Sequence, residues 1–217
     1  MFVGHTAYAQ IVVLAIFLGG MSLGALLISS RSERLQDPLV WYARIELLIG
    51  LIGFVFHPIF NIVTHSAYET LFPVLGNSTA VLIARWTLCA VLILPQSILL
   101  GTTFPLMSAA VLRRFQHQPG GSLAILYFAN SFGAAAGVLL AGFFLIAFVG
   151  LPGTLLIASI INILVALAAF LISYGDSIQP GDATDMTPSA DSASLAAPVE
   201  YPLSSNQLQV LMMSIAG

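Results

Sequence analysis

Five long apolar stretches constrain this sequence more than any other feature. They cover residues 8–29, 45–63, 79–111, 123–149 and 154–174. Each is about as long as, or longer than, the roughly 20 residues that a helix needs to cross ~30 Å of hydrocarbon. The stretches therefore predict an all-α integral membrane protein, a polytopic bundle of about five transmembrane helices.

The composition excludes several classes of function. Hydrophobic residues make up 59% of the chain and charged residues 7%, whereas a soluble domain has about 25% charged residues. A net charge of −3 argues against a nucleic-acid partner, and a single cysteine allows no intrachain disulfide. No histidine pair has metal-ligand spacing and no phosphate-binding glycine loop is present, so we predict no catalytic residue, no metal and no cofactor.

A change of composition marks the end of the predicted bundle. Residues 175–206 are rich in Ser, Pro, Ala and Asp and show no apolar period, which is typical of a flexible, weakly acidic linker. Residues 207–217 are apolar again, and we interpret them as the start of a further helix that the chain end truncates.

The arginines predict how the bundle is oriented. They cluster in the connections that follow the first and third stretches: Arg31, Arg34 and Arg44, then Arg113 and Arg114. The connections at 65–78 and 150–153 contain none. Because basic residues favour the cytoplasmic side, we expect an external N-terminus and a cytoplasmic linker. Arg85 departs from this pattern, and it either reaches the interface or pairs inside the bundle.

Two strips of small residues predict close helix packing. In the fourth stretch they recur at every fourth position: Ala129, Gly133, Gly137 and Ala141. Gly20 and Gly24 have the same spacing in the first stretch. Small residues on one helix face let a neighbouring backbone approach closely. We favour this ordinary packing role over the alternative, a sliding surface for alternating access.

Polar residues within the apolar stretches are the candidate binding groups. Glu46 begins the second stretch, near Arg44; it either reaches water as part of a pair with Arg44 or forms a proton or cation site. His57 and Asn61 share a helix face. Together with polar residues of the third and fourth stretches, they either form interhelical hydrogen bonds or line a solute cavity. The candidate solute- or ion-binding set is therefore Glu46, His57, Asn61, Gln96 and Asn130.

Three stretches together resemble a known family. "WYARIELLIGLIG", "LLGTTFPLMSAAVLRR" and "YFANSFGAAAGVLLAGFFLIAFVGLPGTLL" resemble the membrane part of bacterial proteins in which a major-facilitator-like bundle is fused to a spermidine-synthase-like domain. The resemblance covers residues 2–174 and implies a partial N-terminal half-bundle in the bacterial cytoplasmic membrane. The first stretch would then match the family's second helix, which again places the N-terminus outside.

The stretch "GGMSLGALLISSRSER" resembles the end of the second helix and the following loop of major facilitator transporters, but it matches their loop motif only in part. Glu33 and Arg34 match its acid–Arg pair, which implies a role for them as the loop motif. Ser29 stands where the family has glycine, and Asp37 stands where a basic residue is usual. These departures weaken the expectation that the loop gates transport.

Three hypotheses of function follow. The leading hypothesis is a non-autonomous, transporter-like module that works in the lipid bilayer with a second half-bundle or other membrane subunits. The first alternative is a structural or accessory subunit packed into a larger membrane complex. The second alternative is the membrane anchor of a polyamine aminopropyltransferase-like enzyme. Because the synthase-like domain is absent from this sequence, we do not expect the chain itself to be an enzyme.

Overall fold

The structure, a computed structural model, describes residues 3–32, 35–116 and 119–178. These residues are helical apart from short connections, and they contain no strand. The helices described below all belong to one compact unit, residues 1–178. Most of the predicted linker and all of the predicted truncated helix at 207–217 lie outside the described residues.

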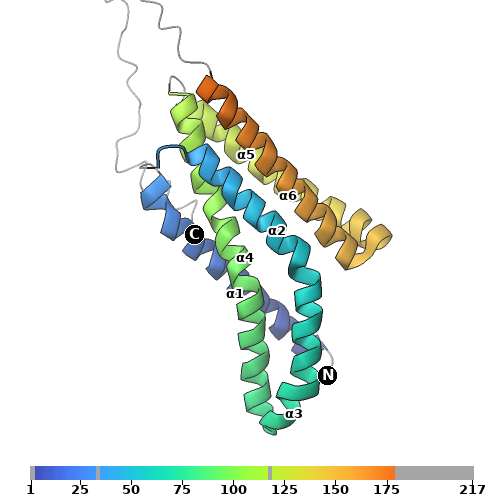
Figure 1. Cartoon of the computed structure of the whole chain (residues 1–217). Helices are drawn as coiled ribbons and strands as arrows, with labels where there is room; N and C mark the ends of the chain where they lie inside the picture. The colour runs from blue at the N-terminus through green and yellow to red at the C-terminus, as the bar shows by residue number, and fades with distance from the viewer. Residues whose placement is uncertain (1–2, 33–34, 117–118, 179–217) are drawn as a thin grey trace, which may run out of the picture. The chain divides into compact units, whose positions relative to one another are not determined.

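Eight helical elements follow one another in the described part of the chain (Figure 1). They are α1 (Val3–Ser32), α2 (Pro38–Ser66), the π-helix η1 (Ala67–Leu71), α3 (Phe72–Leu75), α4 (Ser78–Arg114), α5 (Pro119–Leu140), the π-helix η2 (Ala141–Leu145) and α6 (Ile146–Ile178). Helix α6 continues four residues past the end of the predicted fifth stretch at residue 174. The predicted all-helical class is confirmed for the described residues.

Four helical runs in the described residues are long and apolar enough to cross a membrane. They are Tyr8–Ser32, Pro38–Leu75, Ser78–Arg114 and Pro119–Gly175. The first three correspond to the first three predicted stretches. The fourth and fifth predicted stretches lie in a single run of 57 residues, so the structure gives four such runs where the sequence predicts about five helices.

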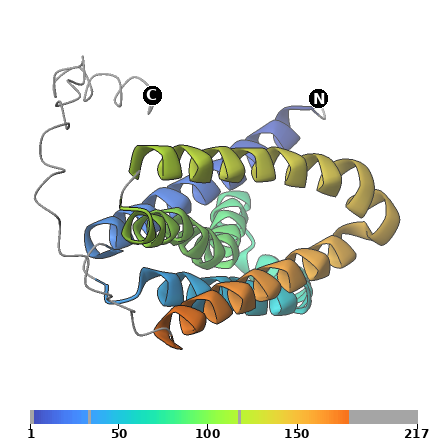
Figure 2. The same ribbon diagram turned by 90° about the horizontal axis from the view of Figure 1, so that it is seen from above.

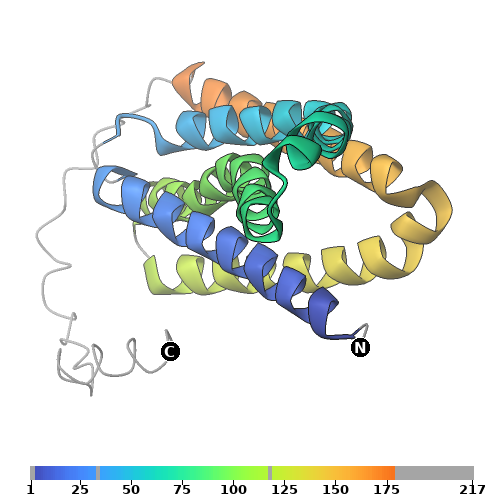
Figure 3. The same ribbon diagram turned by 90° about the horizontal axis from the view of Figure 1, so that it is seen from below.

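Gly150 interrupts the longest of these runs. Its backbone is non-helical, with φ 68° and ψ 179°, a conformation that glycine adopts without the steric penalty of a Cβ. The Thr154 hydroxyl donates a hydrogen bond of 2.8 Å to the Gly150 carbonyl and helps to start the next helical segment. Figures 2 and 3 show the chain turning back between α5 and the main part of α6, so that these two helices form separate arms.

The start of α2 is fixed by its cap. Asp37 has an extended backbone, and its Oδ1 accepts hydrogen bonds from Leu39 N at 3.1 Å and Val40 N at 3.2 Å. Pro38 fills the first helical position, where its missing N–H leaves no hydrogen bond unmade. An aspartate cap followed by proline is a strong helix start, so local sequence decides where α2 begins.

The start of α4 is also encoded locally. Gly76 ends α3 with a positive φ of 58°, and the Asn77 side chain then accepts a hydrogen bond of 2.9 Å from Thr79 N. Helix α4 continues for 37 residues and passes through both Pro95 and Pro105. Neither proline ends the helix.

Helix α4 lies at the centre of the packing. Its main neighbours are α1 and α2, and α2 also packs along α6; Figure 3 shows α4 between α1 and α2. A small core cluster joins α2, α4 and α6, and it consists of Tyr42, Ala43, Leu106 and Ala169. Many large apolar side chains on the outer faces are exposed, as expected of helices whose solvent is lipid.

The connectivity brings most of the basic helix ends together. Helices α1, α4 and α6 finish at one end of the unit, and α2 and α5 start there (Figure 1). Arg31 lies in the last turn of α1, and Arg113 and Arg114 lie in the last turn of α4. Arg85 is far from this end, in the first half of α4. The described arginines therefore divide between the two ends as the sequence predicts.

Candidate functional site

Glu46 is the most buried carboxyl group among the described residues. Its side chain is 7% exposed, and it interacts with Tyr42 one helical turn earlier, which is 9% exposed. The guanidinium of Arg44 instead lies 5.2 Å from the centroid of the Trp41 ring. This burial does not fit the interpretation of Glu46 as a group that reaches water beside Arg44. Burying a carboxyl group within a membrane-spanning helix costs free energy, so such a residue is a candidate functional group.

Gln96 of α4 lies against the same part of α2. Its Nε2 donates a hydrogen bond of 3.3 Å to the Ile49 carbonyl, and Ile49 is on the face of α2 that carries Glu46, three residues away. The Gln96 Oε1 is buried and has no hydrogen-bond partner among the described residues. Gln96 therefore contacts α2 at Ile49, three residues along that helix from the buried Glu46.

Helix α6 covers α2 next to these groups through glycine contacts. A Cβ added to Gly50 would lie 2.9 Å from the Ser159 carbonyl oxygen and 2.7 Å from Ile163 Cγ1. A Cβ on Gly53 would lie 2.5 Å from Ser159 Oγ. Gly50 and Gly53 were not singled out from the sequence, although their spacing of three residues on one helix face was a visible signal for this contact.

His57 and Asn61 form a pair within one helix. Asn61 Nδ2 lies 3.2 Å from His57 Nε2, the histidine is half-buried and the asparagine is exposed. This contact is intrahelical, so it is not the interhelical hydrogen bond considered from the sequence. His57 is about 16 Å along α2 from Glu46 at the rise of an α-helix, and the structure does not join this pair to Gln96.

Asn130 lies apart from the other candidates. It is exposed on α5, a helix in which no described residue is buried. A Cβ built on Gly133 or Gly137 of the same helix would meet no atom of the described residues within 4 Å. Ala129 is exposed and Ala141 half-buried, so the predicted small-residue strip of α5 is not covered by another described helix.

The strip on α1 is in a different environment. A Cβ on Gly20 would collide with the Ser97 hydroxyl, and a Cβ on Gly24 would collide with the Ile98 carbonyl. From the opposite side, a Cβ on Gly101 would collide with the Met21 carbonyl. The backbones of α1 and α4 therefore touch along these glycines. Gly101, like Gly50 and Gly53, was not singled out from the sequence.

Arg85 interacts with aromatic residues at the end opposite the other described arginines. Its guanidinium lies 5.6 Å from the Tyr68 ring centroid and 5.1 Å from that of Phe72, which are cation–π distances. These three side chains line a cavity of about 510 Å³ between α1, the end of α2 and α4. The cytoplasmic-loop residues Glu33 and Arg34 lie outside the described residues.

In the part of the chain that the structure describes, no group of three or more His, Cys, Asp or Glu side chains is placed to hold a metal ion. No protein-family model, curated protein or solved structure matches the chain. The resemblance to the fusion family therefore rests on the three quoted stretches alone.

Proposed function

We propose that this chain is a transporter-like integral membrane module that binds a small solute or ion and works with a second half-bundle. The observation that carries this proposal is the burial of Glu46 on α2, together with the buried, unpartnered Oε1 of Gln96, whose Nε2 donates to the Ile49 carbonyl of the same helix. Ionisable groups inside a membrane mark solute or proton paths more often than they serve packing. Both groups offer oxygen atoms, which suits a proton, a cation or a hydrogen-bond donor.

The proposal includes a topology of five crossings. Gly150 separates the last helical run into two arms, and the arginine-rich helix ends are the cytoplasmic ones, because cytoplasmic connections carry excess basic residues. The N-terminus is then outside and the linker inside, in the bacterial cytoplasmic membrane that the family resemblance implies. Alternating access usually uses paired repeats, so five crossings require a partner half.

Water access to Gln96 tests the proposal directly. In a Cys89→Ser background, a cysteine at position 96 is treated in intact vesicles with a charged, membrane-impermeant thiol reagent. If a solute path reaches this contact from either side, the thiol introduced by Gln96→Cys should react with the reagent. If the Glu46 carboxyl group holds the water-filled site open, Glu46→Leu should abolish that reaction. The measurement is the labelled fraction by mass spectrometry.

Two neighbouring positions on α4 provide matched controls. Ser97 is fully buried against α1 and Val91 is 63% exposed on the outer face, so neither cysteine variant should react with a charged reagent in a membrane. An unreactive Gln96→Cys in a folded protein, or equal reaction at Ser97→Cys, would contradict a solute path along this contact.

A second function, that of a structural subunit, is favoured by α5. This helix has no buried residue among those described, and its strip of small residues is suited to a close helix contact. The native particle is solubilised gently and its mass and subunits are determined. A large stoichiometric complex with several other proteins would favour the structural subunit, whereas a particle that pairs this chain with a single second half-bundle or with a second copy would favour solute binding.

A further inference from the structure

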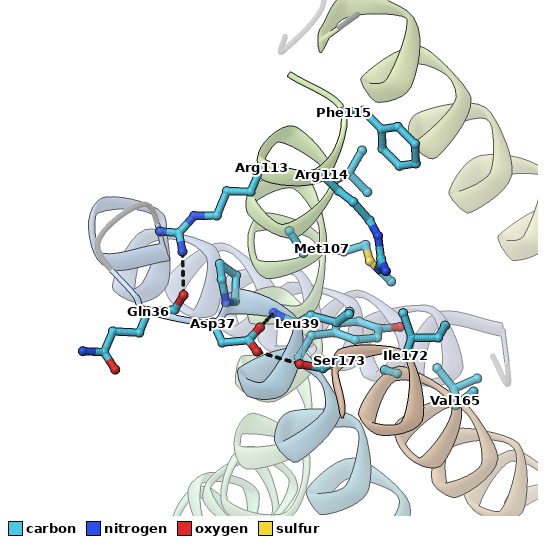
Figure 4. Close-up of a pocket in the computed structure, with 16 residues that line it drawn as sticks. Gln36, Asp37, Leu39, Met107, Arg113, Arg114, Phe115, Val165, Ile172 and Ser173 are labelled. Carbon is cyan, nitrogen blue, oxygen red and sulfur yellow. Dashed lines mark hydrogen bonds between the residues drawn. The ribbon is translucent and has the colours of Figure 1, made fainter. Parts of the chain in front are cut away.

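A cavity of about 880 Å³ lies between the ends of α2, α4 and α6 (Figure 4). Its wall includes the connection before α2 and the end of α4, with Gln36, Asp37, Arg113, Arg114 and Phe115. Pro38 also lines it, and Pro38 and Arg114 are terminal residues of two membrane-spanning runs. The cavity is therefore at the membrane surface, where water is available to fill it.

Tyr42 connects this cavity to the buried Glu46. Tyr42 lines the cavity, and its side chain forms a hydrogen bond with that of Glu46, one turn further along α2. Glu46 is 7% exposed and lies eight residues after Pro38, which is about 12 Å along the helix. Tyr42 thus belongs both to the wall of the cavity and to the contacts of Glu46.

The neighbours of Glu46 leave its carboxyl group without a compensating positive charge. Among the described residues, the side chain that interacts with it is the neutral Tyr42. The guanidinium of Arg44, two residues away in the chain, lies over the Trp41 ring instead. A buried carboxylate without a cation costs much more free energy than a neutral carboxylic acid. This environment therefore favours the form of Glu46 that holds a proton.

The helices packed against α2 do not change this balance. Helices α4 and α6 contribute the apolar Leu106 and Ala169 to the core cluster beside Tyr42. Their charged neighbours at this end, Arg113 and Arg114, line the cavity at the membrane surface together with Asp37. None of these three charges acts on the Glu46 carboxyl group.

The same surroundings do not suit a divalent metal ion. Ca²⁺ takes about six to eight oxygen ligands, and Mg²⁺ requires a near-ideal octahedron. In the part of the chain that the structure describes, Glu46 belongs to no group of three or more His, Cys, Asp or Glu side chains that could hold a metal. A proton, in contrast, needs a single oxygen atom.

We propose that the ion of this site is a proton, and that Tyr42 passes it between the cavity and Glu46. This inference rests on the proposed function, because it identifies the ion that the same site binds. As the proton enters, the Tyr42 O–H bond breaks and its hydrogen bonds to an ionised Glu46 oxygen. A hydronium ion in the cavity supplies the replacement proton to Tyr42 and becomes water. A hydroxyl group suits this role because it both donates and accepts hydrogen bonds.

Infrared spectroscopy of the full chain in lipid vesicles tests whether Glu46 holds a proton. A protonated carboxyl group has a C=O stretching band that an ionised carboxylate lacks. Wild type should show this band at neutral pH, and Glu46→Gln should remove it. The matched control is Glu69, an exposed carboxyl group that pairs with His65 at 3.1 Å, so Glu69→Gln should leave the band unchanged.

The path through Tyr42 is tested by the rate at which this band shifts after rapid mixing with D₂O. Tyr42→Phe keeps the ring and removes the hydroxyl group. Glu46 should therefore stay protonated, while its exchange slows by about 100-fold, the low end of the effect of a positioned proton-transfer group. A tyrosine that served packing alone would leave the rate unchanged.

A second variant blocks the cavity and keeps the hydroxyl group. Ala168 lines the cavity and is exposed, so Ala168→Phe should fold and should also slow the exchange. Ala158 is exposed on the same helix and does not line the cavity, so Ala158→Phe should exchange at the rate of wild type. This pair keeps the test decisive if Tyr42→Phe does not fold.

Three outcomes would overturn the proposal. The first is the absence of a band that depends on Glu46. The second is loss of the band when sodium or potassium is added at constant pH, which would identify a site for a metal cation. The third is an equal exchange rate in wild type, Tyr42→Phe and Ala168→Phe. An unreactive Gln96→Cys beside an intact band would contradict the solute path and support the proton site, so the two failures are distinguishable.

Discussion

Helices α1 and α5 both carry small residues at every fourth position, but only the strip on α1 lies against a neighbouring helix. Gly20 and Gly24 of α1 touch α4 so closely that an added Cβ would collide with Ser97 or Ile98. On α5, a Cβ at Gly133 or Gly137 would meet nothing within 4 Å. The same spacing therefore accompanies a closed interface in one helix and an open face in the other.

The difference shows what small-residue spacing can and cannot predict. Removing side chains from one helix face permits two backbones to approach, and the gain comes from van der Waals contact along the seam. The approach occurs only if a second helix with a matching gap is placed opposite. On α4 that gap is Gly101, whose missing Cβ leaves room for the Met21 carbonyl. No described helix presents such a gap to α5.

Closing the gap on α4 should have the largest effect. In Gly101→Ala the new Cβ meets backbone atoms of Met21, with its C and Cα both 2.7 Å away, and backbone cannot rotate aside as a side chain can. We expect the free energy of unfolding to fall by about 1–3 kcal/mol, despite the higher helix propensity of alanine. Helix content followed by circular dichroism during titration with dodecyl sulfate measures the change. Unaltered stability would mean that α1 and α4 are further apart than described.

A smaller loss is expected where the new methyl group meets a side chain. In Gly20→Ala the contact is with Ser97, whose Cβ would lie 2.9 Å away, and the expected loss is about 1 kcal/mol. Ser97→Gly removes the obstacle, so the double variant should be more stable than the sum of the two single changes predicts. A coupling energy of about 0.5 kcal/mol or more in a double-mutant cycle is expected, and additive changes would contradict the contact.

The smallest effect, with the opposite sign, is expected on the open face. Gly137→Ala adds a methyl group in open space and raises helix propensity, so stability should rise by up to about 1 kcal/mol. The same titration measures it, which makes Gly137→Ala the matched control for Gly101→Ala. If Gly137→Ala is stabilising in the isolated chain but weakens a native complex with other membrane proteins, α5 is the face that a partner subunit covers.

The candidate site was only partly predictable from the sequence. Polar residues inside apolar stretches are visible as exceptions, so Glu46 and Gln96 were found. The structure buries Glu46 on α2 and places the Gln96 side chain against the Ile49 carbonyl of the same helix. His57 and Asn61 have the same signal, but their side chains meet each other within α2. Asn130 is equally polar and is exposed on α5. Which polar groups meet depends on helix rotation, which a single stretch of sequence does not define.

The sequence by itself determined that this protein is helical and that its helices suit a membrane. The local caps Asp37 and Asn77 fix the starts of α2 and α4, although the predicted second stretch began only at residue 45. These properties depend on the length of apolar runs and on hydrogen bonds between residues close in the chain. Only the tertiary structure decided that the strip of α1 is covered while that of α5 is open, and that a cavity beside Tyr42 forms between α2, α4 and α6. The physical reason is that such features require atoms from helices distant in sequence to occupy neighbouring space, and their relative position follows from packing.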